Sequence, residues 1–243
     1  MKVIVIIPAA GLGTRMASAP KSRLPAPSKQ FTELAGTPIL IHTLRKFGAV
    51  SAISEIWIAL RKTEMEEFRG RLEDEKKGAL SKNIRLVEGG EHRQQSVANA
   101  LAALSADPAD IVLVHDAVRP FVTREIIEEV IAAAQKYGAA IAGMPAIDTV
   151  KQVDRTAEGA LITATVPRER VVLAQTPQGF RYDVLKKAFD EANADGFLGT
   201  DEASLVERSG KEVAVVMGSP KNIKITTPAD LELAEFYLKT TKN

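Results

Sequence analysis

The chain alternates between short apolar runs and longer segments in which apolar residues recur at helical spacing. The apolar runs are rich in Val and Ile, as is typical of buried strands. Strands that alternate with helices predict an α/β fold, with a mainly parallel sheet and helices on both of its faces. The strands that we expect are residues 3–7, 55–60, 84–87, 111–115, 139–144 and 212–217.

Helix boundaries are marked by residues with capping chemistry. The dipeptides 37–38 and 227–228 place a Thr before a Pro, which predicts an N-cap followed by the first helical residue. Thr63 has capping-box spacing to a Glu three residues later, so a further helix should begin there. Gly48 and Gly138 fit the ends of helices.

The helical period disappears between residues 145 and 175. Within this stretch, residues 149–153 and 161–165 have strand character, and Gly159 lies between them. The pattern predicts a hairpin arm, and an insertion of this kind often meets a second subunit. No linker-like change in composition divides the rest, so we interpret residues 1–243 as one domain with an arm at about 145–175.

Composition narrows the class of function. The 243 residues are 45% hydrophobic and 26% charged, which is enough for a globular core. Lys and Arg number 32 and Asp and Glu 31, so the formal charge of +1 does not favour nucleic acid as a partner. No apolar stretch approaches the ~20 residues of a membrane span, and the apolar N-terminal run is too short for a signal peptide.

Reactive side chains of the commonest kinds are missing or scattered. Cysteine is absent, which excludes disulfides and thiolate nucleophiles and fits a cytoplasmic location. His42, His92 and His115 lack metal-ligand spacing, and no Ser-His-Asp pattern stands out. We therefore assign the histidines no catalytic role.

A glycine-rich turn, residues 8–16, follows the first strand. Gly11 and Gly13 let the backbone approach a ligand, exposed N–H groups can bind phosphate oxygens, and Arg15 adds a cationic fork. A dinucleotide fingerprint would need a third glycine where Met16 stands, and the chain has no P-loop motif. The turn is interpreted as a triphosphate cradle, against the plainer alternative of a strand-to-helix turn.

An acid and a base follow the strand at 111–115. Ligands gather at the carboxyl ends of strands in open α/β sheets, so Asp116 could hold Mg²⁺ against phosphate oxygens while Arg119 reaches a second anion. The alternative is a structural Asp that accepts bonds from nearby backbone amides.

Two weaker signals lie further along the chain. The glycine pair at 89–90 can offer backbone groups, and Ser96 a hydroxyl, to the edge of a base. Lys224 is predicted to lie on a short strand beside polar neighbours, where a lysine is usually just solvated.

Taken together, these segments resemble the family of 2-C-methyl-D-erythritol 4-phosphate cytidylyltransferases over essentially the whole chain. The motifs occur in the family's order. They are residues 8–16, Lys29-Gln30-Phe31, Gly89-Gly90-Glu91 with Arg93, His115-Asp116-Ala117 with Arg119-Pro120, Thr176-Pro177-Gln178, Thr200-Asp201-Glu202-Ala203 and Asn222-Ile223-Lys224.

The resemblance implies a Rossmann-like nucleotide-diphosphosugar transferase fold and a homodimer clasped through the β-hairpin arm. It implies that CTP and a polyol phosphate are the substrates and that Mg²⁺ takes part. The reaction would transfer CMP to 2-C-methyl-D-erythritol 4-phosphate, giving 4-diphosphocytidyl-2-C-methyl-D-erythritol and pyrophosphate in non-mevalonate isoprenoid synthesis.

The resemblance also implies roles for individual residues, with Asp116 on the metal side. The catalytic cations would be Arg15, Lys29, Arg168 and Lys224. The residues that hold CTP would be Ala9, Ala10, Gly11, Gly13, Thr14, Gly90, Glu91, Ser96 and Ala117. Those around the acceptor, some of them from the neighbouring subunit's arm, would be Arg119, Thr149, Arg168, Thr176 and Thr200.

The chain departs from the family pattern at several positions. The Pro-rich basic segment 17–28 is longer than usual and contains Lys21, a rival to Lys29 for the catalytic role. We favour Lys29 because Gln-Phe follows it, and leave open whether the segment closes over CTP. Thr14 stands where an Arg is often found, and Glu91 where Asp is common.

The implied chemistry needs no general base. A phosphate monoester with a second pKa near ~6 is mostly ionised at pH 7 and can attack the α-phosphate unaided, so the protein must supply alignment and positive charge. The nearest alternative is a ribitol 5-phosphate cytidylyltransferase, which would differ in the acceptor pocket. More distant alternatives are an enzyme that uses GTP or UTP and a non-catalytic nucleotide-binding regulator.

Overall fold

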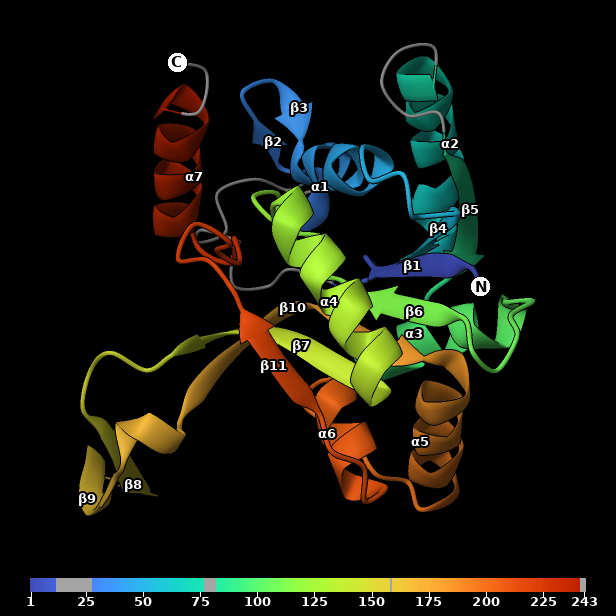
Figure 1. The fold of residues 1–243 in the computed structure, drawn as a ribbon. Coiled ribbons are helices and arrows are strands. Elements are labelled where there is room, and N and C mark those ends of the chain that lie inside the picture. Colours follow the sequence, from blue (N-terminus) through green and yellow to red (C-terminus); the bar gives the residue numbers. More distant parts are fainter. Residues whose placement is uncertain (12–27, 77–81, 158, 241–243) are drawn as a thin grey trace.

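The computed structural model describes residues 1–11, 28–76, 82–157 and 159–240. A seven-stranded sheet forms its centre, in the order β11-β7-β10-β6-β1-β4-β5 (Figure 1). The strands are β1 (Val3–Pro8), β4 (Glu55–Leu60), β5 (Asn83–Glu88), β6 (Ile111–Val114), β7 (Ala139–Pro145), β10 (Val172–Arg181) and β11 (Ala214–Met217). All pairings are parallel except those of β10, so the prediction of a mainly parallel sheet is confirmed.

Helices cover both faces of this sheet, as the alternation of the sequence predicts. Successive side chains of a strand point to opposite faces, and β1 is buried on both. Val3, Val5 and Ile7 pack with α1 (Ile39–Gly48), α2 (Lys62–Lys76) and α4 (Arg124–Tyr137). Ile4 and Ile6 pack with α3 (Arg93–Ala103), α5 (Tyr182–Ala194) and α6 (Glu202–Arg208).

A smaller apolar cluster joins the C-terminal helix to the rest. Helix α7 (Pro228–Thr240) contributes Ala234, which is buried with Leu34 and Ile225. Leu34 lies in a short ribbon of β2 (Glu33–Leu34) and β3 (Thr37–Pro38), which follows the 3-10 helix η2 (Lys29–Phe31). No helix in the described part of the chain is long and apolar enough to cross a membrane.

The predicted helix boundaries are partly right. Helix α7 begins at Pro228, and the Thr227 hydroxyl accepts the N–H of Asp230, as the Thr-Pro pattern predicts. Gly138 ends α4 in the left-handed region, with φ 87°. The other two starts are wrong, because residues 37–38 form β3 instead of a helix start, and Thr63 lies inside α2.

Strand β10 is the element that the sequence analysis missed. It lies between β6 and β7 in the middle of the sheet and runs antiparallel to both. Its sequence contains Pro177 and Gly179, residues that argue against a central strand. The register shifts between Ala174 and Gln178, and this irregularity accommodates the proline inside the sheet.

A hairpin of β8 (Val150–Thr156) and β9 (Gly159–Val166) lies where the sequence pattern places one. It forms a separate two-stranded sheet, away from the seven-stranded one (Figure 1). The hairpin leaves and re-enters the body through β7 and β10, which are neighbours in the main sheet. Its part in dimerisation stays a prediction.

The start of β1 is tied to β6 by a buried carboxylate. Asp110 is 1% exposed and accepts the N–H of Lys2 at 2.6 Å and that of Asp107 at 2.9 Å. Burial raises the pKa of Asp110, but the two backbone bonds outweigh it and hold the pKa below its ordinary value. The ionised form therefore stabilises the fold above the ordinary pKa of ~3.9, and this stabilisation is lost as the pH falls.

We predict that Asp110→Asn lowers the free energy of unfolding by ~1–3 kcal/mol at pH 7, because one backbone N–H loses its acceptor. The difference from the wild type should narrow as the pH falls below ~3.9, where the wild-type carboxyl also becomes protonated. Urea denaturation at pH 7, 5 and 3.5 measures both effects. Asp107→Asn, at an exposed neighbour, is the control, and a pH-independent difference at Asp110 would contradict the prediction.

Candidate active site

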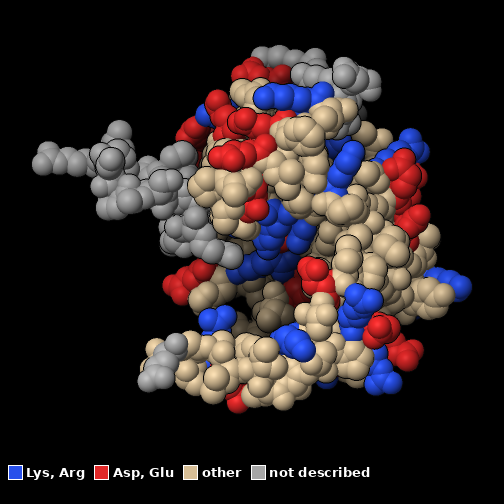
Figure 2. All heavy atoms as spheres, turned by 90° about the vertical axis from the view of Figure 1, so that its left-hand side faces the viewer, with Lys and Arg blue, Asp and Glu red and all other residues tan. Residues whose placement is uncertain are grey.

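Two adjoining pockets open at the carboxyl ends of β1 and β6. The first, of about 120 Å³, is lined by residues 8–11, 29–30, 90–93, 96, 116–118 and 224. The second, of about 190 Å³, is lined by residues 93, 116, 119, 174–176, 178, 200–201 and 224. Arg93, Asp116 and Lys224 line both pockets and form the wall between them. Figure 2 shows Lys and Arg side chains gathered in a hollow near the middle of this face.

Glycine lets two turns of the first pocket approach each other. A Cβ on Gly89 would lie 2.4 Å from the Cβ of Ala10, so only glycine fits after β5. The neighbouring Gly90 donates its N–H to the Ser96 hydroxyl at 3.1 Å, and that hydroxyl donates to the His92 carbonyl. Ser96, 2% exposed, therefore holds the turn in shape.

Lys29 enters the first pocket from η2. Its neighbour Gln30 is 1% exposed and donates its side-chain N–H to the Ala9 carbonyl at 2.5 Å. Phe31, on the other side, stacks against Phe68 of α2 at 5.6 Å between ring centroids. The hydrogen bond from Gln30 thus holds η2 against the backbone that follows β1. It thereby sets the position from which the Lys29 side chain extends.

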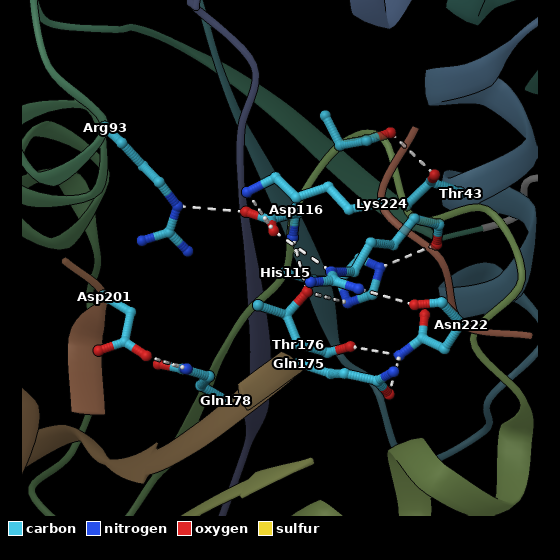
Figure 3. A network of polar contacts seen from close by, with 12 residues as sticks. Thr43, Arg93, His115, Asp116, Gln175, Thr176, Gln178, Asp201, Asn222 and Lys224 are labelled. Carbon is cyan, nitrogen blue, oxygen red and sulfur yellow. Dashed lines mark hydrogen bonds and ion pairs between the residues drawn. The ribbon is translucent and has the colours of Figure 1, made fainter. Parts of the chain in front are cut away.

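Asp116 is the centre of the wall and meets three cationic side chains (Figure 3). Its Oδ1 accepts Arg93 Nε at 3.2 Å, and its Oδ2 contacts Lys224 Nζ at 2.9 Å and Arg119 Nε at 3.3 Å. Burial alone would raise the pKa of Asp116, but the three cations hold the pKa far below its usual range. The carboxyl is therefore ionised at neutral pH.

A second buried carboxylate lies behind the first. Both oxygens of Glu202, at the start of α6, accept Arg93 Nη1, at 2.6 and 2.8 Å. Burial raises the pKa of Glu202, and the Arg93 cation opposes that rise. The pKa of Arg93 is raised, because its two carboxylate partners outweigh the effect of burial. Together with Arg119 and Glu202, the wall forms a network of three cations and two carboxylates.

Hydrogen bonds from β10 hold the backbone of Asp116. Its N–H donates to the Thr176 hydroxyl at 3.0 Å, and Thr176 lies 3.1 Å from His115 Nδ1. His115 Nε2 lies 3.1 Å from the Arg119 carbonyl, which can only accept, so Nε2 carries the ring proton and Thr176 donates to Nδ1. Burial lowers the pKa of His115 to about 4, so this chain of bonds contains a neutral ring at pH 7.

The segment before Lys224 is anchored to the same strand. Asn222 is fully buried and donates its side-chain N–H groups to the Thr176 carbonyl at 2.9 Å and to Gln175 at 3.2 Å (Figure 3). The backbone carbonyl of Asn222 accepts a hydrogen bond from Arg119 Nη1 at 2.7 Å. The prediction of a short strand at Lys224 is wrong, because the segment has no sheet partner among the described residues, and Lys224 points at Asp116 from an irregular segment tied to both β10 and Arg119.

The structure brings most of the predicted site residues together. The predicted residues that line the first pocket are Ala9, Ala10, Gly11, Lys29, Gly90, Glu91, Ser96, Asp116, Ala117 and Lys224. Those that line the second pocket include Arg119, Thr176 and Thr200. Thr149 and Arg168 line neither pocket of the described chain, and Arg168, in η3 (Arg168–Arg170), donates to the Ile147 carbonyl instead. Gly13, Thr14, Arg15 and Lys21 lie outside the described residues.

Metal binding at Asp116 finds no support in this arrangement. Both of its oxygens contact cations, and the nearest carboxylate in the network, Glu202, is taken by Arg93. The described residues contain no group of three His, Cys, Asp or Glu side chains that could hold a metal ion. Mg²⁺ at a nucleotide site commonly takes one or two protein carboxylates and completes its shell with phosphate and water oxygens, so Asp116 as a metal ligand stays a prediction.

Several residues of the site escaped the sequence analysis. Arg93 and Glu202 stand in motifs that carry the resemblance but received no role, and nothing in the sequence signals that they pair. Gln30 was used in the sequence analysis only to distinguish Lys29 from Lys21, and its bond to Ala9 was not predicted. His115 was assigned no catalytic role, and the structure uses its ring to hold the turn around Asp116.

Known proteins match the chain over nearly its whole length. Residues 3–240 match the family described as 2-C-methyl-D-erythritol 4-phosphate cytidylyltransferase. The chain belongs to this family. Proteins of that name from Acidobacterium capsulatum and Solibacter usitatus are 58% and 52% identical to it, over 98% of this chain and 98% and 96% of theirs.

Solved structures agree with this assignment. The 4-diphosphocytidyl-2C-methyl-D-erythritol synthase of Anaerococcus prevotii is similar with a TM-score of 0.81 and 34% identity, covering 98% of this chain and 96% of that one. The 2-C-methyl-D-erythritol 4-phosphate cytidylyltransferase of Thermus thermophilus has a TM-score of 0.76 and 36% identity, covering 98% and 100%. The family resemblance and the α/β fold expected from the sequence are thus confirmed.

We predict that Gln30→Met, which keeps the volume but removes the bond to Ala9, lowers kcat by roughly 10- to 100-fold, because small displacements of a charged group in a reacting site are that costly. Steady-state kinetics of pyrophosphate release measure the change. Gln135→Met, on the exposed surface of α4, is the matched control. An unchanged kcat in a folded Gln30→Met protein would rule out a role for Gln30 in positioning Lys29.

Proposed function

We propose that this chain transfers CMP from CTP to 2-C-methyl-D-erythritol 4-phosphate and releases pyrophosphate, as a step of isoprenoid precursor synthesis. The observation that carries the proposal is the cationic wall between two pockets, in a member of this family. CTP would occupy the first pocket, with its glycine turns, and the acceptor phosphate would approach from the second. The two reactants would then meet across Lys224.

The wall suits the meeting of two anions. With both carboxylates ionised, the three cations of the network leave one net positive charge before any substrate binds. An ionised phosphate monoester can attack without a base, so the protein's task is to align the reactants and to offset the negative charge that builds in the transition state. Lys224 and Lys29, which both line the first pocket, would act there, with Arg15 added by the resemblance.

The full-length relatives argue against ribitol 5-phosphate as the acceptor. Those described above carry the methylerythritol name and share up to 58% identity with the chain. A decisive assay pairs CTP, UTP, GTP or ATP with methylerythritol 4-phosphate or ribitol 5-phosphate and records pyrophosphate release. We expect release only from CTP with methylerythritol 4-phosphate. Release with ribitol 5-phosphate would move the function to that alternative, and no release with any pair would indicate a binding protein.

The need for Mg²⁺ rests on the family resemblance, and no step proposed above depends on it. The same assay in the presence of EDTA tests it directly.

We predict that Lys224→Ala lowers kcat by roughly 10²- to 10³-fold, as the loss of one preorganised charge in the transition state does. Lys29→Ala should have a similar effect, whereas Lys21→Ala should have less than a few-fold effect. Single-turnover measurements at saturating CTP compare the three variants. The reverse order for the two N-terminal lysines would transfer the catalytic role to Lys21.

A homodimer that meets through the arm would explain two features. Thr149 and Arg168 lie away from the pockets of their own chain, and the arm region carries exposed apolar side chains. Leu161 and Ile162 of β9 are 66% and 64% exposed, and such surface is commonly covered by a partner. A partner's arm could bring Thr149 and Arg168 to the second pocket. The cytoplasmic location likewise stays a proposal from composition.

We predict that the double substitution Leu161→Lys and Ile162→Lys converts the proposed dimer to a monomer. It should also lower the rate of CMP transfer to the acceptor. Sedimentation velocity measures the mass. Phe236→Lys, at a similarly exposed position on α7, should leave the mass unchanged. A wild-type monomer would contradict the proposal outright.

A further inference from the structure

The buried Glu202 has no assigned part in the reaction, although it pairs with Arg93 of the wall between the pockets. Glu202 is 1% exposed, and its two oxygens contact one nitrogen of Arg93, Nη1. Arg93 extends from α3 and uses its Nε for Asp116. The guanidinium is thus divided between two carboxylates that come from different parts of the chain.

This division leaves an oxygen of Asp116 for other partners. An arginine left with one carboxylate commonly grips both of its oxygens with a two-pronged fork. Here Arg93 contacts only Oδ1 of Asp116, and Oδ2 receives Lys224 at 2.9 Å. Glu202 holds the end of the guanidinium that could otherwise turn onto Asp116 and compete with Lys224.

Charge balance points in the same direction. With Glu202 ionised, three cations face two carboxylates, and without it they would face one. The excess repulsion would be relieved by the cation that can most easily move toward water. The side chain of Lys224 is 36% exposed, against 28% for Arg93 and 11% for Arg119. Loss of Glu202 should therefore displace Lys224 first.

The position of Glu202 is itself tightly held. Asp201 caps α6 by accepting the N–H of Ser204 at 2.9 Å. Gln178 of β10 donates to Asp201 at 2.7 Å and accepts the N–H of Ala203 at 3.0 Å. Glu202 lies between these fixed neighbours. Because a buried ion pair is often no more stabilising than apolar residues of similar volume, stability alone is a weak reason for this one.

We propose that Glu202 is a positioning residue of the transfer reaction: it restrains Arg93 so that Asp116 can hold Lys224 at the wall between the pockets. The proposal rests on the proposed function for the effect on turnover, but the placement of Lys224 can be measured without any substrate.

The substrate-free test is chemical labelling of lysines in Glu202→Gln, a substitution of equal size that removes the charge. Brief treatment with acetic anhydride and mass spectrometry give the labelling of Lys224 relative to the exposed Lys187 in the same sample. We expect Lys224 to be labelled several-fold faster than in the wild type, because its ion pair with Asp116 is weakened. Unchanged labelling would overturn the proposal, whatever the enzyme's activity.

The kinetic test is made once the wild-type protein has been shown to release pyrophosphate. Glu202→Gln should lower kcat/KM for the acceptor roughly 10- to 100-fold and leave KM for CTP within about 3-fold, and Glu202→Asp should retain more activity because it keeps the charge. Equal effects on both substrates would contradict the proposal. The matched control is Glu75→Gln, which breaks the forked pair of Arg45 and Glu75 outside both pockets and should leave activity unchanged.

A double variant separates positioning from simple loss of structure. If Glu202 acts by restraining Arg93, adding Arg93→Met to Glu202→Gln removes the competitor for Asp116, so the labelling of Lys224 in the double variant should return toward the wild-type rate. Labelling as fast as in Glu202→Gln alone would refute the proposal. Circular dichroism and thermal melting establish that each variant is folded. Should Glu202→Gln not fold, Arg93→Lys, which keeps the charge but cannot reach both carboxylates, should show the same labelling and kinetic changes.

Discussion

The site depends on one ionised carboxylate, that of Asp116, held almost out of water at the end of a central strand. A buried charge is tolerated only when partners compensate for its lost hydration. Here the partners are Arg93, Arg119 and Lys224, which come from a helix, from the turn after β6 and from a segment before the last helix. Asp116 therefore draws two distant parts of the chain to its own turn, and the positive charge gathered there is what two anionic substrates would meet.

The central antiparallel strand makes this convergence possible. Strand β10 lies beside β6, and its irregular stretch places Thr176 against the backbone of Asp116 and Gln178 against the start of α6. The same stretch accepts the side chain of Asn222, which anchors the segment that carries Lys224. One strand thus supports the turn that carries the carboxylate, one of its cations and the helix that supplies the second carboxylate.

The two pockets differ in the kind of lining that they have apart from the shared wall. The first is bounded by glycine turns, where backbone groups can approach a ligand closely, whereas the second is bounded by the side chains of β10 and of residues 200–201. The cationic wall is common to both. Such an arrangement lets a nucleotide and an acceptor bind to different chemistry and still share the charge that offsets their repulsion.

The sequence by itself determined the alternation of strands and helices, the glycine turns and the family. These are local properties, because periodicity and turn chemistry act over a few neighbouring residues. The tertiary structure alone decided that β10, despite Pro177 and Gly179, lies in the middle of the sheet, and that Arg93 meets Glu202 from 109 positions away. A charged residue carries no mark of its partner in the sequence; which side chains meet depends on which elements pack together, and that is settled only when the whole sheet forms.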